Sequence, residues 1–219
     1  MPKPAYKSCN PVLLKSLREK RRLTQSALAA AAGYTERLIV KAESGATLSR
    51  ETIEDLAAAL STPSEQIYPE DLTTDLIQLA QAYVHAVYTY QKDAVAHIRH
   101  FLDEDIVFII PGDPAVLPFA GEHRGPDAIH DAFQIFFSIL EVPPDHDHRP
   151  HYRFLCQGTD VVVWGKSYIR PIGHTMPEPM PISNLLQFRK GKLYRFQDQY
   201  DTQLAEKVIR ESAVRTAEV

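Results

Sequence analysis

A short pattern near the N-terminus restricts the fold of this 219-residue chain more than any other feature. Thr24 precedes an alanine-rich run that extends to Ala32, and alanine is the strongest helix former. Gly33 follows, and glycine ends helices because it readily adopts the left-handed backbone conformation. Thr35 then supplies a capping residue for a second short helix through Glu43. Two short helices joined by a glycine turn predict a helix-turn-helix unit.

Further helices are predicted on either side of this pattern. Asn10-Pro11 begins one, because Asn caps free amides and Pro at the first helical position loses no hydrogen bond. Another is expected from Ser49 to Leu60, followed by a short helical turn over residues 64–68. The first part of the chain is therefore expected to be an all-α bundle.

Charge is distributed unevenly along the chain. The total is −4, but the first 50 residues hold ten Lys or Arg against three acids, a net charge of +7. A basic segment joined to an acidic remainder predicts a nucleic-acid-binding module attached to a second domain. Pro63, Pro69 and an acidic run interrupt the helical periodicity, so we expect domains over residues 1–69 and 70–219.

The first domain contains, in this order, the motifs Leu23-Thr24-Gln25, Leu28-Ala29, Ala32-Gly33-Tyr34-Thr35, Ile39 and Ala42-Glu43-Ser44-Gly45. In order and spacing they resemble the Cro/repressor (XRE) helix-turn-helix family over about residues 10–68. The resemblance implies binding to double-stranded DNA.

The residues themselves suggest how DNA would be contacted. Ile39 and Ala42 are expected to face the core, which leaves the opposite face of that helix outward. Arg37 can pair with guanine, and the start of the preceding helix can hold a phosphate. An ordinary solvated helix face is the alternative, but the complete motif on a basic segment favours DNA. The predicted DNA-contacting residues are Thr24, Gln25, Thr35, Glu36, Arg37, Val40 and Lys41.

The second domain is predicted to contain helices first and strands afterwards. The helices are expected at 76–87, 94–102 and 126–140, with a closing helix at 202–210. The strands are expected at 106–110, 152–157, 161–169, 182–189 and 192–200. Three helices and a curved antiparallel sheet wrapped around them form an α+β cone with an internal cavity.

Several motifs agree with this fold. They are Tyr83 to Asp93, Phe101 to Phe108, Pro111-Gly112, Pro118 to Gly125 and Phe188 to Leu193. Their order resembles the SnoaL-like superfamily, which includes ketosteroid isomerase, polyketide cyclases and nuclear-transport-factor-like folds, over about residues 74–208. The expected architecture is therefore a helix-turn-helix bundle followed by a SnoaL-like cone.

Isomerase chemistry is not expected from this domain. Ketosteroid isomerase needs an Asp base and a second, protonated acid. In our alignment the base position falls on Ile109, which cannot move a proton, and the second-acid position falls near Asn184.

Asp198 is the candidate for a different chemistry, because the polyketide cyclase and epoxide hydrolase branch presents an Asp from a late strand. Alternation places Tyr194, Phe196, Asp198 and Tyr200 on one face of that strand. Burial among aromatics would raise the pKa of Asp198. A structural pairing of Asp198 is the alternative. The residues predicted to bind a small apolar ligand are Tyr83, His85, Trp164, Asn184, Asp198 and Tyr200.

Metal and membrane functions are not indicated. The segment 145–151 contains His and Asp residues, but its prolines predict a solvated loop, so no metal and no cofactor is expected. Two cysteines without C-x-x-C spacing do not suggest a disulfide framework. No apolar run is long enough for a membrane helix, which predicts a soluble, cytoplasmic protein.

Together these features favour a one-component transcriptional regulator whose second domain senses a small apolar molecule, dimerises, or does both. A homodimer is expected because one short recognition helix reads too few base pairs. The alternative is a cyclase, hydratase or hydrolase that uses Asp198 and carries a DNA-binding module. Of the two, the sequence favours the regulator over the enzyme. A third hypothesis is an assembly module whose cavity is filled by side chains.

Overall fold

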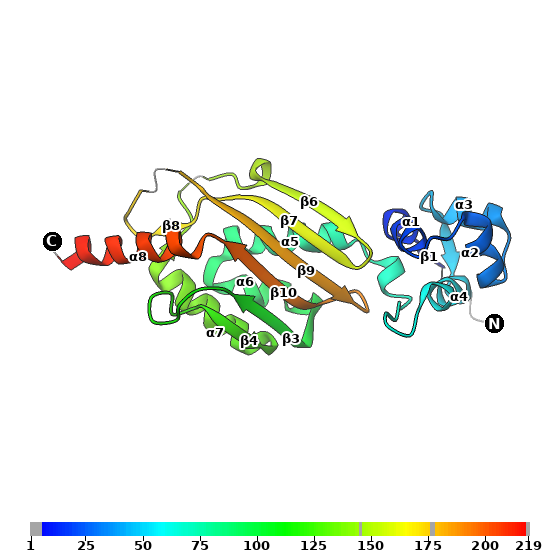
Figure 1. Ribbon diagram of the computed structural model, residues 1–219, viewed down its shortest axis with the longest axis horizontal. Coiled ribbons are helices and arrows are strands. Elements are labelled where there is room, and N and C mark those ends of the chain that lie inside the picture. The colour runs from blue at the N-terminus through cyan, green and yellow to red at the C-terminus, as the bar shows by residue number, and fades with distance from the viewer. Residues whose placement is uncertain (1–5, 145, 176–177, 218–219) are drawn as a thin grey trace. The chain divides into compact units, whose positions relative to one another are not determined.

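The computed structural model describes residues 6–144, 146–175 and 178–217, and the chain divides into two compact units. The first unit comprises Met1–Leu76 together with Cys156–Asp160 and Phe188–Lys192. The second comprises Ile77–Leu155, Val161–Gln187 and Leu193–Val219. Figure 1 labels the elements of both units.

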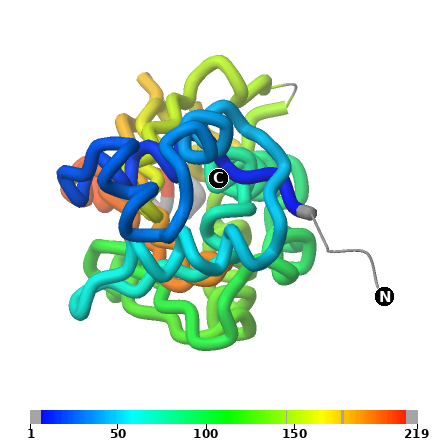
Figure 2. Tube along the Cα trace, turned by 90° about the vertical axis from the view of Figure 1, so that its right-hand side faces the viewer, coloured from blue at the N-terminus to red at the C-terminus, as the bar shows by residue number. Residues whose placement is uncertain are grey.

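The first unit is mainly helical. Figure 2 shows its short helices, in blue to cyan, running in different directions. Buried leucines and Ile39 fill the space between them. One feature absent from the sequence-based expectation is a two-stranded antiparallel ribbon in which Tyr6 pairs with Ser49. The elements are β1 (Tyr6–Ser8), α1 (Pro11–Lys20), α2 (Gln25–Ala32), α3 (Glu36–Ala42), β2 (Thr47–Ser49), α4 (Arg50–Leu60) and η1 (Asp71–Thr73).

Helix capping follows the sequence closely in this unit. The side chains of Asn10, Thr24 and Ser49 accept hydrogen bonds from amides in the first turns of α1, α2 and α4, at 3.1, 3.0 and 3.2 Å. Gly33 ends α2 with φ of 77°. Thr35 occupies the N-cap position of α3, but within this described segment its side chain makes no capping hydrogen bond. The predicted cap is therefore correct in position and wrong in its side-chain contact.

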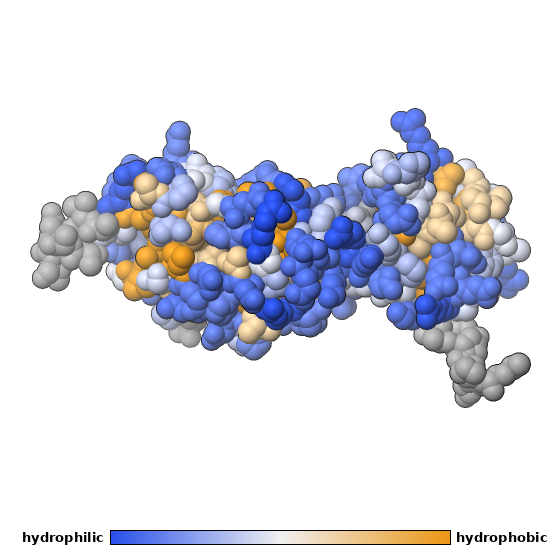
Figure 3. Space-filling view, turned by 90° about the horizontal axis from the view of Figure 1, so that it is seen from below, coloured by the Kyte–Doolittle hydropathy of each residue, from blue (hydrophilic) through white to orange (hydrophobic). Residues whose placement is uncertain are grey.

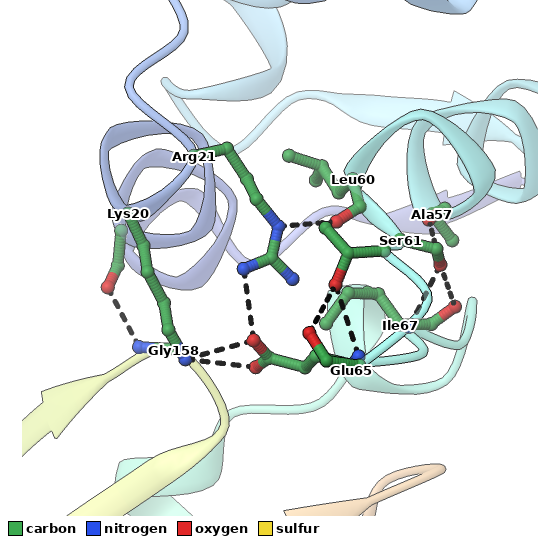
Figure 4. A network of polar contacts seen from close by, with 11 residues as sticks. Lys20, Arg21, Ala57, Leu60, Ser61, Glu65, Ile67 and Gly158 are labelled. Atoms are coloured by element: carbon green, nitrogen blue, oxygen red, sulfur yellow. Dashed lines mark hydrogen bonds and ion pairs between the residues drawn. The ribbon is translucent and has the colours of Figure 1, made fainter.

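The predicted helical turn over residues 64–68 is wrong. Thr62 and Glu65 form a β-bridge around a tight turn. The Ile67 amide donates to the Ser61 hydroxyl at 3.0 Å instead of continuing a helical ladder. Figure 4 shows how Lys20 at the end of α1 and Arg21 directly after it converge on the Glu65 carboxylate, with contacts of 3.0 Å. Side-chain bonds from α1 and from Ser61 thus replace the helix.

The second unit contains a six-stranded sheet and the helices that cover it. The sheet order is β4-β3-β10-β9-β7-β6. In Figure 1 the helices α5, α6 and α7 lie along one side of the sheet. The helices are α5 (Leu76–Tyr90), η2 (Gln91–Asp93), α6 (Ala94–Ile98), η3 (Arg99–Phe101), α7 (Gly125–Ile139), η4 (Arg149–His151) and α8 (Thr202–Ala217). The strands are β3 (Leu102–Ile110), β4 (Gly121–Arg124), β5 (Leu140–Glu141), β6 (Tyr152–Gln157), β7 (Asp160–Ser167), β8 (Arg170–Pro171), β9 (Met180–Arg189) and β10 (Lys192–Tyr200).

The predicted fold class, a helical bundle followed by an α+β cone, is confirmed. One strand pair departs from the antiparallel expectation, because β10 runs parallel to β3, with Phe196 beside Phe108. Their rings stack at 3.9 Å between centroids. The last strand thus lies in the interior of the sheet, between β3 and β9, where both of its edges are paired.

Candidate functional site

A cavity of about 160 Å³ lies in the second unit, lined by residues of α5, α7, α8 and the sheet. An engineered cavity of about 150 Å³ holds one benzene molecule, so this one is large enough for a small aromatic ligand. The hypothesis that side chains fill the interior is therefore wrong. Most of the wall is apolar, including Phe108, Phe119, Phe133, Phe136, Phe196, Leu117, Ile182 and Met180.

Asp198 carries the only carboxyl group among the described residues that line this cavity. Its Oδ1 atom accepts from Asn184 Nδ2 at 2.5 Å and from the Gln199 amide at 2.9 Å. Within the described chain both hydrogen bonds go to Oδ1, which leaves Oδ2 for a proton or a ligand. Burial raises the pKa of Asp198 to about 7, although these two hydrogen bonds act in the opposite direction.

Besides Asn184 and Ser167, tyrosine hydroxyls provide polar groups in the cavity. Tyr83 packs against Phe196 at 5.1 Å between ring centroids, and its hydroxyl has no hydrogen-bond partner among the described residues. Burial and the nearby Asp198 charge raise the Tyr83 pKa well above 10. Tyr88 contacts Tyr152 at 2.5 Å and Ser167 at 3.2 Å through their hydroxyls. Tyr88, Tyr152 and Ser167 form a hydroxyl cluster that the sequence did not indicate.

Four of the six predicted ligand-binding residues line the cavity: Tyr83, Asn184, Asp198 and Tyr200. The Tyr200 hydroxyl donates to the Pro111 carbonyl at 2.6 Å, which fixes that ring.

The placement of His85 and Trp164 on the cavity wall is wrong. His85 is exposed, and its ring lies 5.7 Å from that of His148 outside the cavity lining. Trp164 is 55% exposed. On β7 the cavity residue Ser167 shares its face with buried Val161 and Val163. Trp164 shares the other face with exposed Lys166, and that charged neighbour is the sequence signal that would have placed it correctly.

Ile109, the position aligned with the isomerase base, also faces away from the cavity. Its neighbours Phe108 and Ile110 line the cavity instead. Neither side chain can transfer a proton, so β3 supplies no acid or base to the cavity.

The C-terminal helix forms part of the cavity wall. Ala205, Val208 and Ile209 line it from α8. The helix is attached to the loop after β3 through Glu206 Oε1, which accepts from the Asp113 amide at 3.2 Å. Figure 3 shows apolar surface, in orange, gathered on the second unit beside this helix. Exposed Leu204 belongs to α8 itself, at 40% exposure.

The histidine-containing loop packs more tightly than predicted. His148 stacks on Tyr88 at 4.8 Å between centroids, and His146 lies 4.3 Å from the Tyr168 ring. Asp145 lies outside the described residues. Within the described chain no group of three or more His, Cys, Asp or Glu residues is arranged to hold a metal ion.

The exposed face of α3 is the second candidate site. Ile39 and Ala42 are fully buried, as the spacing predicts. Four predicted DNA-contacting residues, Glu36, Arg37, Val40 and Lys41, are exposed, and so is Thr35. Among the described residues neither Arg37 nor Lys41 takes part in an ion pair.

Gln25 is engaged inside the first unit. Its amide donates to Glu43 Oε2 at 2.8 Å, and the same carboxylate accepts from Arg18 Nε at 2.5 Å. Arg18 also donates to the Leu23 carbonyl at 2.9 Å. The side chain of Gln25 therefore connects α2 to a buried ion pair and is not directed at a ligand.

The basic character of the first 50 residues is balanced within the same unit. Residues 1–76 contain ten basic and ten acidic side chains, because every charge from 51 to 76 is negative. Arg21 and Arg50 are paired with Glu65 and Glu54. The positive charge available to DNA is therefore restricted to particular positions, such as Arg37 and Lys41 on α3.

Comparison with known families agrees with both units. A family model for a helix-turn-helix domain matches residues 12–67, and one for a SnoaL-like domain matches residues 80–196. The second match covers more than half of the chain, which therefore belongs to the SnoaL-like family. No curated protein matches the chain.

Two solved structures are similar to part of this chain, and the first of them supports an NTF2-like fold. An NTF2-like protein from Burkholderia xenovorans is 23% identical, with a TM-score of 0.50, over 61% of this chain and 95% of that one. An NTF2-like protein from Burkholderia pseudomallei is 16% identical, with a TM-score of 0.48, over 60% and 96%. In the described part of the chain no helix has the length and apolarity needed to cross a bilayer.

Proposed function

We propose that this chain is a DNA-binding transcriptional regulator of the Cro/repressor (XRE) type, acting in the cytoplasm as a homodimer and controlled by a small molecule bound in the SnoaL-like cavity. The helix-turn-helix domain suggests DNA binding, and the SnoaL-like domain suggests ligand binding or catalysis. The observation that carries the proposal is the α3 face, where Arg37 and Lys41 are exposed while the opposite face is buried.

In this proposal Arg37 reads a guanine and Val40 contacts a thymine methyl group, while Lys41 contacts phosphate. Glu36 and Thr35 lie at the start of α3, where they would adjoin the same groove. Thr24 and Gln25 contribute through the main chain of α2, since their side chains are used internally.

Homodimer formation is supported by apolar residues on the sheet face that points away from the cavity. Leu155 on β6 and Trp164 on β7 are 60% and 55% exposed, and these strands are neighbours. Large apolar side chains exposed on two neighbouring strands suit a protein interface. Because Trp164 is the only tryptophan, its emission reports burial of this face directly.

The test is selection of binding sites from a random duplex library with the full-length protein, followed by titration at two salt concentrations. Arg37→Ala should weaken binding to the selected site by about 5- to 150-fold, corresponding to about 1–3 kcal/mol for a bidentate base contact. Arg50→Ala is the matched control, because it removes an equal charge from an exposed side chain at the start of α4. Equal losses in both variants, or no sequence enrichment, would overturn the DNA-reading role.

A second candidate function is catalysis by Asp198 on a small apolar substrate. The specific observation is a cavity carboxylate with an unused Oδ2 atom and a pKa of about 7, since a general acid or base works best when its pKa lies near the working pH. The Asp198→Asn variant should then lose turnover of a cyclisation, hydration or hydrolysis substrate by at least 100-fold. Unchanged turnover would remove Asp198 from that role.

A further inference from the structure

The cavity contains an uncompensated acid. Among the described lining residues none is Lys, Arg or His, so Asp198 has no positive partner there. A buried carboxylate is costly unless it is paired, and here neutral Asn184 and a backbone amide are its only described hydrogen-bond partners. A ligand that brings a positive charge would therefore stabilise the buried Asp198 carboxylate.

The groups around Asp198 are suited to an ammonium group. A primary ammonium has three N–H donors and no acceptor. Acceptors come from Asp198 Oδ2, from Asn184 Oδ1, which remains after its Nδ2 donates, and from the Tyr83 hydroxyl oxygen. Tyr83 and Phe196 also present aromatic rings, whose faces attract cations.

We propose that the cavity binds the protonated form of a small primary amine with an apolar body, its ammonium held by Asp198, Asn184 and Tyr83. The proposal rests on the ligand-sensing role and names the class of ligand. The hydrocarbon part would lie among Phe108, Phe133 and Ile182, in a space of about 160 Å³ that limits it to roughly one aromatic ring.

Other ligand charges fit less well. A carboxylate or phosphate ligand would enter a wall with no cationic side chain among the described residues and would meet Asp198. A neutral alcohol of the same shape would leave the Asp198 charge unpaired.

The test uses benzylamine, benzyl alcohol and benzoate as probes of nearly equal size, with binding to the full-length protein measured by calorimetry at pH 8. Benzylamine should bind at least tenfold more tightly than benzyl alcohol, and benzoate should bind most weakly. Benzyl alcohol binding as tightly as benzylamine, or no measurable binding of benzylamine at millimolar concentration, would overturn the proposal.

The dependence on pH gives a second readout. Benzylammonium is somewhat more acidic than the Lys ammonium, whose pKa is about 10.4, but it is still protonated at pH 8, so only the protein group changes state below pH 8. With a pKa of about 7 for Asp198, benzylamine affinity should rise about 30-fold from pH 5.5 to 8, with a proton released on binding at the lower pH. The four cavity tyrosines, with pKa values raised by burial, stay neutral throughout. The other titratable groups near these walls are His146 and His148 beside Tyr88, and Glu206 on α8.

Asp198→Asn should weaken benzylamine at least tenfold and change benzyl alcohol less than about threefold, which also shows that the variant is folded. Asp105→Asn, an exposed acid on β3, is the matched control and should change neither. His148→Phe should leave the pH dependence of benzylamine binding intact. Loss of both probes together in Asp198→Asn, or retention of both, would contradict the ammonium site.

Operator titrations with and without benzylamine separate this proposal from the proposed function. Amine binding that depends on Asp198 but leaves operator affinity unchanged would keep the ammonium site and remove the sensing role. If benzyl alcohol changes operator affinity and benzylamine does not, the ligand-sensing role stands, but the ligand is not an amine.

Discussion

Glu43 in the first unit and Asp198 in the second are both carboxylates held inside the protein, but they are partnered differently. Glu43 accepts from Arg18 and Gln25, and its side chain is only 6% exposed. Burial alone would raise the pKa of Glu43, but those two hydrogen bonds lower it. Asp198 has only neutral partners, and burial raises its pKa to about 7.

The difference separates groups that hold the fold from groups available for function. The Arg18–Glu43 pair joins α1 to the end of α3, so every polar atom in it serves the bundle. Asp198 keeps one oxygen open toward a cavity. A polar group that is buried and incompletely paired costs stability, and proteins keep such groups mainly at functional sites.

The largest effect on stability is expected from breaking the Arg18–Glu43 ion pair. Glu43→Ala leaves the Arg18 guanidinium buried without its counter-ion, which should cost about 3–5 kcal/mol of unfolding free energy for the first unit. Chemical denaturation followed by far-ultraviolet circular dichroism measures it. Glu54→Ala, which removes an exposed partner of Arg50, serves as control and should change stability little. If both variants lose equally little, Glu43 is not a structural group.

Substituting Asp198, whose Oδ2 atom has no described hydrogen-bond partner, is expected to stabilise the fold. The folded-state pKa of about 7 exceeds the unfolded value of 3.8, so wild-type stability should rise as pH falls from 7 to 4 and be lowest above 7. Asp198→Asn should therefore raise the melting temperature by about 3 to 6 °C at pH 8 and by less at pH 5. A variant that melts lower than wild type at pH 8 would show that Asp198 stabilises the fold.

Two threonines give a second comparison between a side chain that holds the fold and one that is left free for binding. Thr24 accepts a capping hydrogen bond from Ala27, whereas Thr35 makes none within its described helix. Thr24→Ala should cost about 1 kcal/mol of stability, and Thr35→Ala only a few tenths. Operator binding should be weakened more by Thr35→Ala than by Thr24→Ala. Thermal melting with a matched DNA titration checks both, and equal stability losses would contradict the assignment.

The smallest effect concerns the histidine loop. Burial lowers the pKa values of His146 and His148, with neighbouring histidines adding to the effect. The unfolded chain then binds more protons just below pH 6.5, so stability should fall as pH drops through 6.5. In an Asp198→Asn background, which removes the opposing carboxyl effect, His148→Phe should reduce this fall by a few tenths of a kcal/mol. Identical pH profiles would exclude a contribution from His148.

Local chemistry made much of the fold predictable. Asn10, Thr24 and Ser49 cap helices where their residue types suggested, and the predicted bounds 152–157 and 192–200 coincide with β6 and β10. Long-range pairing was not predictable in the same way. Nothing local to Leu193–Gln197 shows that it runs parallel to β3, or that residues 6–8 pair with 47–49.

The cavity was predictable where alternation and polarity agreed. Asp198 and Tyr200 followed from the period of β10, whereas Trp164 was chosen for its aromatic ring against the evidence of Lys166 on the same face. The Tyr88, Tyr152 and Ser167 cluster joins three elements distant in sequence, so only the assembled fold brings these hydroxyls together.

The position of β10 has a consequence for how a ligand enters and leaves. Asp198 lies on a strand hydrogen-bonded on both edges, so it stays fixed while the sheet remains intact. The helix α8 starts four residues later and supplies Ala205, Val208 and Ile209 as a wall that can move without breaking any strand pairing. The proposed ligand would therefore lie between a carboxylate fixed in the sheet and a helical wall that belongs to no strand pair.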